Sequence, residues 1–159
     1  MSQIKFTPMP TEYADACWAG EPDANGLAPE RHMSDGSGIP CRHCLQTVAA
    51  GDPYLILAYR PFDMLQPYAE VGPIFLHADR CTRYQGDGST PALYLDGEQR
   101  LLKGYNNDDR IIYGTGKIVE PESIADYAGQ LLGDPSVSYV HMRSSQNNCY
   151  SCRIDRTGD

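Results

Sequence analysis

The amino-acid sequence predicts an α+β fold: a single domain, residues 1–159, with a largely antiparallel β-sheet and about two helices. The chain has 159 residues, of which 41% are hydrophobic and 21% charged, an ordinary composition for one globular domain. Short apolar or alternating segments between turn residues outnumber the segments with helical periodicity. Most of these segments follow one another directly along the chain, which favours antiparallel pairing.

The first predicted elements are a short strand and a short helix. Ile4–Phe6 has the composition of a strand. Thr11, which follows Pro10, is placed to cap a helix over Glu12–Ala19, and Gly20 is placed to end it.

The next segment, 20–40, is rich in Gly, Pro, Asp, Asn and Ser. This composition predicts a long loop, with a short strand at Glu30–Met33. We therefore expect residues 1–30 to form an N-terminal extension with one short helix, and residues 31–156 to form the core.

Apolar or alternating runs, each near Gly, Pro, Asn or Asp, predict the remaining strands. They cover Tyr54–Arg60, Gly72–Ala78, Leu101–Tyr105, Lys117–Val119, Val137–Arg143 and Tyr150–Ile154. The turn sequence between Leu101–Tyr105 and Arg110–Tyr113 predicts that these two segments pair as a hairpin.

Pro121–Leu132 carries the clearest helical pattern in the chain. Apolar residues recur from Ile124 onward at spacings of three and four, forming one stripe. Glu120 and Glu122 suit the positive end of the helix dipole, and Gly133 is placed to end the helix.

Five of the six cysteines lie in three short clusters, and Cys17 stands apart. The clusters are Cys41-Arg42-His43-Cys44, His77-Ala78-Asp79-Arg80-Cys81 and Cys149-Tyr150-Ser151-Cys152. A gap of two residues lets a tight turn direct both sulfurs at one ion, and a structural zinc takes four such donors in a tetrahedron. The sequence therefore predicts a metal site, with zinc as the expected cofactor.

Two ligand sets remain open. The first is Cys41, Cys44, His77 and Cys81, and the second is Cys41, Cys44, Cys149 and Cys152. The second set requires the last strand to lie beside the first. A closed set of four ligands would be structural, whereas three ligands and a water would permit hydrolytic chemistry.

Other interpretations of the same residues also stay open. Cysteines often pack as small buried hydrophobes, and His43 would then be a solvent-facing spacer. Arg42 and His43 beside Cys44 favour a thiolate, so a thiol–disulfide redox protein is an alternative. His141 lies in an alternating strand and is expected to be a hydrogen-bonded structural residue rather than a ligand.

A third hypothesis is a small-molecule binder or enzyme with a pocket lined by arginines and tyrosines. The candidates are Arg60, Arg110, Arg143, Arg153, Arg156, Tyr54, Tyr59, Tyr68, Tyr105, Tyr113 and Tyr139. Arginines at strand ends can hold a carboxylate or phosphate, but packing and ion pairing are their commoner roles. No catalytic motif is present, so the sequence leaves open whether the protein is an enzyme.

The net charge of -8 argues against nucleic-acid binding and against docking on anionic lipid. No apolar run approaches the length of a membrane span, and Met1–Trp18 has no apolar signal region. We therefore expect a cytoplasmic protein, whose thiols stay reduced. The oligomeric state and any small-molecule or protein partner are not indicated.

Several motifs resemble an uncharacterised bacterial family catalogued as domain of unknown function 1203. They are Pro40-Cys41-Arg42, Gly51-Asp52, Tyr54-Leu55-Ile56-Leu57, Pro67-Tyr68, Gly72-Pro73-Ile74-Phe75, Tyr139-Val140-His141, Cys149-Tyr150 and Ile154-Asp155-Arg156. The resemblance covers about residues 30–156 and implies no known activity. It implies that Cys41 and Cys149 match the family pattern. Cys44, His77, Cys81 and Cys152 would then belong to a site specific to a subgroup.

Overall fold

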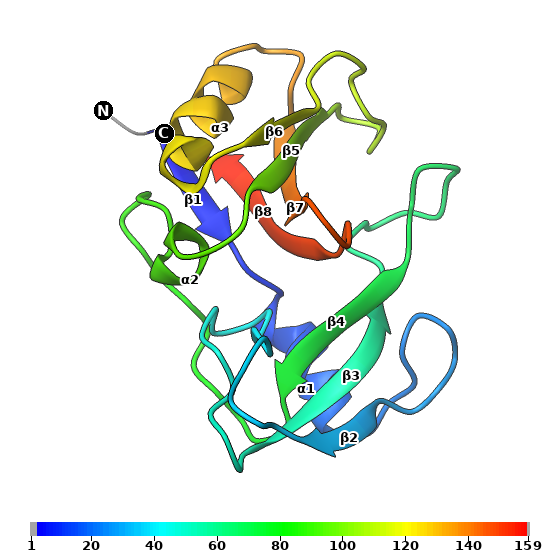
Figure 1. Cartoon of the computed structure of the whole chain (residues 1–159). Helices are drawn as coiled ribbons and strands as arrows, with labels where there is room; N and C mark the ends of the chain where they lie inside the picture. The colour runs from blue at the N-terminus through cyan, green and yellow to red at the C-terminus, as the bar shows by residue number, and fades with distance from the viewer. Residues whose placement is uncertain (1–2, 159) are drawn as a thin grey trace. The chain divides into compact units, whose positions relative to one another are not determined.

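Two antiparallel β-sheets organise the chain, one in each of two units (Figure 1). The computed structural model describes residues 3–158. The five-stranded unit comprises residues 3–7, 64–68 and 85–158, and the three-stranded unit comprises residues 8–63 and 69–84.

The five-stranded sheet has the order β1-β8-β7-β5-β6, so the first strand pairs with the last. Its strands are β1 (Ile4–Thr7), β8 (Tyr150–Arg156), β7 (Tyr139–Ser144), β5 (Arg100–Tyr105) and β6 (Lys117–Val119). Leu102, Val140, Met142 and Ile154 are fully buried in its core. Burial of these aliphatic side chains stabilises the sheet by roughly 1.5–3 kcal/mol each.

Helix α3 (Ile124–Leu132) covers this sheet with the apolar stripe that the sequence predicts. A 3-10 turn, η1 (Pro121–Ser123), leads into it, because a proline fits the first turn of a helix. The Arg156 guanidinium donates hydrogen bonds to the carbonyls of Leu132, Asp134 and Val137. This strand-end arginine therefore secures the end of the helix.

The predicted hairpin between Leu101–Tyr105 and Arg110–Tyr113 is only partly correct. Residues 110–113 form no strand and make one isolated bridge, between Tyr105 and Ile111. The physical reason is a side chain: the Thr115 hydroxyl accepts the Gly104 N–H at 2.9 Å, where a strand would have supplied a carbonyl.

One short helix, α2 (Ala92–Leu95), was not predicted, because four residues are too few for a periodic pattern. Its Tyr94 is buried, and the Tyr94 hydroxyl donates to the Ser151 carbonyl at 3.2 Å. A tertiary contact, rather than local preference, accounts for the position of this turn.

The three-stranded sheet has the order β2-β3-β4, and helix α1 (Thr11–Trp18) belongs to the same unit. Its strands are β2 (Glu30–Met33), β3 (Pro53–Tyr59) and β4 (Gly72–His77). Alternate residues of β3 and β4 are buried, among them Leu57 and Leu76, as the strand period requires. The β4 strand ends at His77, at the site described below.

The prediction that Thr11 caps the helix is wrong. Pro10 occupies the cap position in an extended conformation, and Thr11 is the first helical residue. Its hydroxyl is 2.9 Å from Nε2 of His43. A long-range hydrogen bond therefore replaces the local one.

The α+β class, the antiparallel pairing and the helices at both predicted positions are confirmed. The boundary predicted at residue 30 stays a prediction. β1 and α1, which both precede it, belong to different units.

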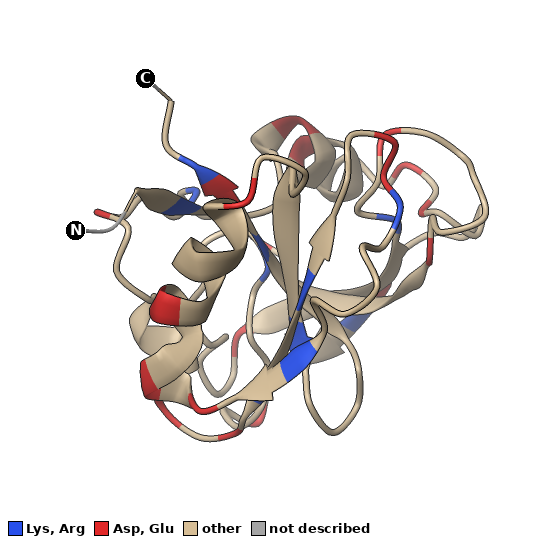
Figure 2. Cartoon of the chain, turned by 90° about the horizontal axis from the view of Figure 1, so that it is seen from above, with Lys and Arg blue, Asp and Glu red and all other residues tan. Residues whose placement is uncertain are grey.

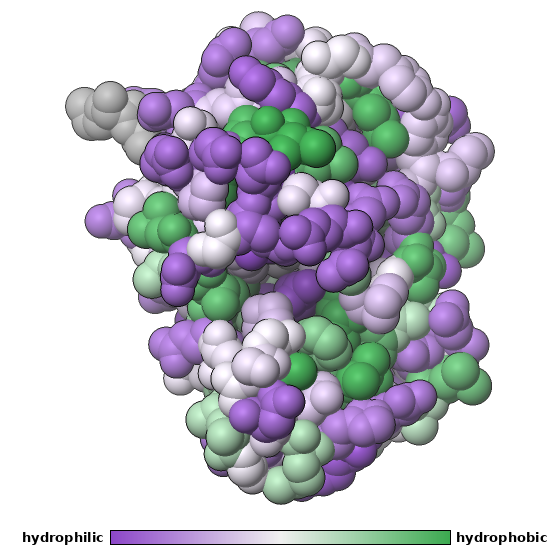
Figure 3. Space-filling view, viewed as in Figure 1, coloured by the Kyte–Doolittle hydropathy of each residue, from purple (hydrophilic) through white to green (hydrophobic). Residues whose placement is uncertain are grey.

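Acidic residues lie on the helices and on several loops, as Figure 2 shows. In Figure 3 apolar residues form separate patches on a largely hydrophilic face. Within residues 3–158 no helix has the length and apolar character needed to span a membrane, since the longest has nine residues.

Candidate metal centre

The loop 40–47 carries the first two candidate donors, Cys41 and Cys44. It folds back on itself: Pro40 bridges Thr47, and the Cys41 N–H donates to the Gln46 carbonyl at 3.0 Å. The Leu45 N–H donates to the Cys41 carbonyl at 3.0 Å, which closes the turn between the two cysteines.

Leu45 adopts the left-handed conformation, with φ at 57°, directly after the second cysteine. This conformation costs a non-glycine residue roughly 1–2 kcal/mol. The Leu45 side chain is only 4% exposed, and its burial offsets a cost of that size. The turn therefore tolerates leucine where glycine would be less strained.

The loop 40–47 lies beside the end of β4. Cys41 pairs with Phe75 in an isolated parallel bridge, and the Arg42 N–H donates to the Phe75 carbonyl at 3.0 Å. This docking brings Cys41 close to His77, the last residue of β4. The chain after β4 returns to the loop, where the Tyr84 N–H donates to the His43 carbonyl at 3.0 Å. That return positions Cys81.

The structure thus brings together the four residues of the first predicted set. One donor atom from each of Cys41, Cys44, His77 and Cys81 lies within 4.8 Å of every other. Cys41 Sγ is 3.8 Å from Cys81 Sγ, and Cys44 Sγ is 3.4 Å from His77 Nδ1. All six cysteines are free thiols.

The thiols of Cys41, Cys44 and Cys81 lie close enough to shift one another's pKa values. The pKa of Cys41 is strongly lowered, because the thiols of Cys44 and Cys81 and the imidazole of His77 donate to its sulfur. The pKa of Cys44 is raised to about 11, because Cys44 gives its hydrogen to Cys41, and the pKa of Cys81 is also raised, first by Cys41. The crowding thus opposes ionisation of Cys44 and Cys81, whereas a divalent cation would stabilise three thiolates.

Backbone N–H groups also point at the sulfurs. The His77 N–H donates to Cys41 Sγ at 3.4 Å, and the Cys44 N–H lowers the pKa of the same thiol. The Gln46 N–H likewise lowers the pKa of the Cys44 thiol, against the larger effect of Cys41, which raises it. Such bonds partly neutralise thiolate charge in a buried site.

His43 lies behind Cys81 and is 1% exposed, so the alternative that it is a solvent-facing spacer is wrong. Its Nδ1 is 3.2 Å from Cys81 Sγ, and its Nε2 is 2.9 Å from the Thr11 hydroxyl. Burial lowers the pKa of His43, so its imidazole is neutral near pH 7. A Thr11 hydroxyl that donates to Nε2 leaves the proton on Nδ1, directed at Cys81. No local sequence signal distinguishes this histidine from a spacer.

The two ends of helix α1 contact His77 of the Cys3His cluster and the neighbouring His43. Thr11 at the first position bonds to His43, and Trp18 at the last position donates from Nε1 to the His77 carbonyl at 2.8 Å. The Trp18 and His43 rings also meet in a T-shaped arrangement, at 5.5 Å between centroids. The Arg80 guanidinium stacks over Trp18 and pairs with Asp15.

One side of the cluster opens to a polar pocket of about 470 Å³. Cys44, His77 and Cys81 line this pocket together with Asp79 and Arg80. Cys41 is fully buried, Cys44 is 8% exposed and Cys81 is more exposed than either.

The cysteines of the third cluster lie in the five-stranded unit. The Cys149 thiol faces the Asn147 carbonyl at 3.8 Å, and the fully buried Cys152 thiol faces the Arg153 carbonyl at 3.3 Å. Neither belongs to a group of donors that could hold a metal ion among residues 3–158. The isolated Cys17 is buried, and burial raises its pKa to about 11.

Two of the predicted tyrosines and one of the predicted arginines pack around a buried histidine. Tyr105, Tyr139 and Tyr150 surround the buried His141, with ring centroids about 5 Å away, and Arg153 stacks on Tyr139 at 4.0 Å. Buried among these rings and near several cations, His141 has a pKa well below its ordinary value and is neutral. The Arg and Tyr hypothesis stays a prediction.

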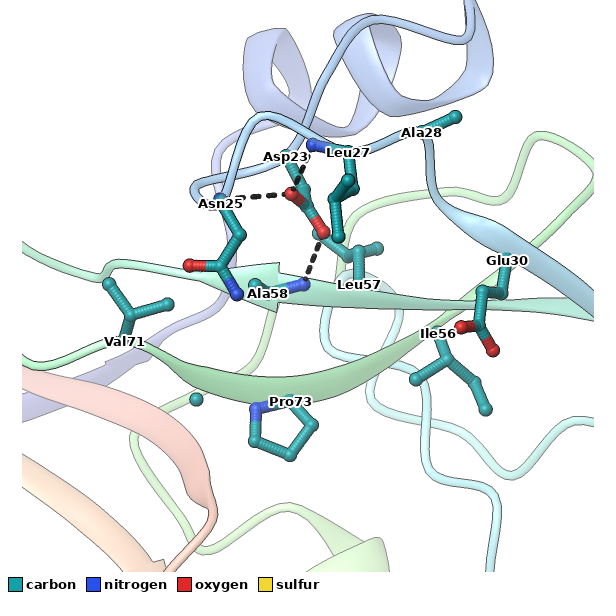
Figure 4. A pocket seen from close by; sticks show the side chains of 11 residues that line it. Asp23, Asn25, Leu27, Ala28, Glu30, Ile56, Leu57, Ala58, Val71 and Pro73 are labelled. Atoms are coloured by element: carbon teal, nitrogen blue, oxygen red, sulfur yellow. Dashed lines mark hydrogen bonds between the residues drawn. The ribbon is translucent and has the colours of Figure 1, made fainter.

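A second pocket in the three-stranded unit, of about 300 Å³, lies beside Asp23 (Figure 4). The Asp23 carboxylate accepts the N–H groups of Asn25, Leu27 and Ala58 at 2.9–3.1 Å. These bonds lower the pKa of Asp23 and fix the loop against β3. Figure 4 shows that aliphatic side chains such as Ile56 form much of the remaining wall. The carboxylate therefore serves the loop rather than a ligand.

Fold and site together define an α+β protein with a Cys3His cluster that could hold a metal ion. Residues 38–156 match a family described as protein of unknown function (DUF1203), and the chain belongs to that family. No curated protein and no solved structure matches the chain. The four clustered donors all lie within the matched residues. That Cys44, His77, Cys81 and Cys152 depart from the family pattern stays a prediction.

Proposed function

We propose that this protein binds one zinc ion through Cys41, Cys44, His77 and Cys81, in a closed structural site. The separation of the donor atoms carries the proposal. In a tetrahedron with Zn–S of 2.3 Å and Zn–N of 2.0–2.1 Å, sulfurs lie about 3.8 Å apart and a sulfur and a nitrogen about 3.5 Å apart. The separations of 3.8 and 3.4 Å in the structure lie close to these values. The longest separation, up to 4.8 Å, would shorten by about 1 Å on binding.

The type of donor favours zinc over other ions. Thiolates are soft ligands that Mg²⁺ and Ca²⁺ do not select, and three thiolates with one imidazole form a common structural zinc set. Four protein donors fill the tetrahedron, which favours a structural role over a catalytic one. The ion also requires reduced thiols, so we propose a reducing compartment such as the cytoplasm.

The structural consequence of zinc would be to join the loop 40–47 to the continuous stretch that runs from the end of β4 through 78–84. Backbone hydrogen bonds already link these two parts of the chain. We propose that the metal stabilises the three-stranded unit as a binding or interaction module.

Metal analysis of the reduced protein, purified without chelators, tests the proposal directly. We expect about one zinc per chain, with three thiols that react with a thiol reagent only after a chelator is added. Zinc content and the thiol count are measured on the same sample, so that the number of protected thiols can be compared with the number of zinc ions. Less than about a tenth of an equivalent of zinc, with no uptake when zinc is supplied, would contradict the proposal.

His43 is expected to strengthen zinc binding without being a ligand. Replacing His43 with Phe keeps an aromatic ring against Trp18 but removes the ring nitrogen that lies 3.2 Å from Cys81 Sγ. Loss of such an outer partner typically lowers metal affinity about 10- to 100-fold. Competition with a chromophoric chelator measures the affinity. His32→Phe, at an exposed position of β2, is the control, and equal affinities of the two variants would refute the role of His43.

A further inference from the structure

The clustered cysteines differ in their access to solvent. Cys81 lines the polar pocket and is partly exposed, whereas Cys41 beside it is fully buried. A small polar reagent that enters the pocket therefore meets Cys81 before it can meet Cys41.

The sulfurs of Cys41 and Cys81 are already in contact, at 3.8 Å. A disulfide requires about 2.05 Å, so a shift of about 1.8 Å would join them. Cys81 lies in the segment 78–84, outside any helix or strand, while Cys41 is held by its bridge to Phe75. The shift would therefore fall mainly on Cys81.

We propose that Cys81 is an oxidation site for peroxides, and that its oxidation joins Cys41 to Cys81 and releases the metal. The inference rests on the proposed zinc site. A zinc-bound thiolate retains its nucleophilic sulfur, and the pocket that Cys81 lines admits hydrogen peroxide.

The reaction proceeds in two steps. The Cys81 thiolate attacks one peroxide oxygen and the O–O bond breaks, which gives the Cys81 sulfenic acid and a hydroxide that the buffer protonates. The Cys41 thiolate then attacks Cys81 Sγ of the sulfenic acid, and the S–O bond breaks with release of a second hydroxide. In sum, two thiolates, one peroxide and two protons give one disulfide and two waters. Zinc loses two of its four ligands and dissociates.

The sequence makes the product easy to identify. Trypsin cleaves after Arg31, Arg42, Arg80 and Arg83 but not between Arg60 and Pro61. It thus places Cys41 in peptide 32–42, Cys44 in peptide 43–80 and Cys81 in peptide 81–83. Each possible disulfide within the cluster therefore gives a different pair of linked peptides.

The experiment treats the zinc-loaded full chain with hydrogen peroxide, and follows zinc with a chromophoric chelator and disulfides by mass spectrometry. We expect zinc release in step with linkage of peptide 32–42 to peptide 81–83, and reversal of both by a dithiol with added zinc. Cys17→Ser and Cys149→Ser, outside the cluster, should release zinc at the wild-type rate.

Cys81→His is the decisive variant, because it keeps four donors but removes the thiol in the pocket. We expect it to release zinc at least about tenfold more slowly under peroxide. If Cys81→His binds no zinc, the linked peptides found in the oxidised wild-type chain decide by themselves whether Cys41 and Cys81 form the disulfide. Zinc retained under peroxide, or a link from peptide 43–80 instead, overturns this inference and leaves the zinc site standing. Absence of zinc before oxidation overturns the proposed function as well.

Discussion

Replacing Cys41 with Ser is expected to reduce bound zinc from about one ion per chain to less than about a tenth. Cys41 is the central donor: its sulfur contacts Cys81 and accepts the N–H of His77. A serine hydroxyl is not ionised near pH 7 and does not replace a thiolate on zinc. Elemental analysis of the purified variant, with circular dichroism to establish its fold, measures the effect.

Cys152→Ser is the matched control for this substitution. Cys152 and Cys41 are both fully buried, so each variant buries one hydroxyl in place of a thiol. Only Cys152 lies outside the cluster. Zinc loss in Cys152→Ser, with zinc kept in Cys81→Ser, would instead support the set that includes Cys149 and Cys152.

Removing the zinc with a chelator is expected to destabilise the three-stranded unit by about 4 kcal/mol, if free zinc had been a thousandfold above its dissociation constant. The metal joins the loop 40–47 to β4 and to the segment 78–84, so these segments should open together. Their amide hydrogens should exchange up to about a thousandfold faster, since the free energy of binding stabilises the closed form.

Hydrogen-exchange mass spectrometry with and without chelator measures this effect segment by segment. Peptides from β7 and β8, in the core of the five-stranded sheet, serve as the internal reference. Zinc returned in excess should restore the protection. Unchanged exchange at 40–47 after complete metal removal would show that protein contacts hold the loop in place without the metal.

Much of the fold could be predicted because its signals are local. A nearly continuous apolar run indicates the strand at Tyr54–Arg60, and one apolar stripe indicates the helix at Ile124–Leu132. The failures occur where a distant partner replaces a local one. Thr11 bonds to His43 rather than to its own helix, and the Thr115 hydroxyl takes the place of a strand beside Gly104.

The sequence alone determined the donor chemistry of the candidate site and the proximity of donors within each cluster. Cys41 and Cys44, or His77 and Cys81, are so few residues apart that any tight turn keeps them close. Only the tertiary structure decided which clusters meet, because that depends on the docking of the loop 40–47 on β4. It also placed His43 behind Cys81, which no spacing predicts. Contacts between residues far apart in sequence depend on the packing of the whole unit, and a single sequence carries no local signal for them.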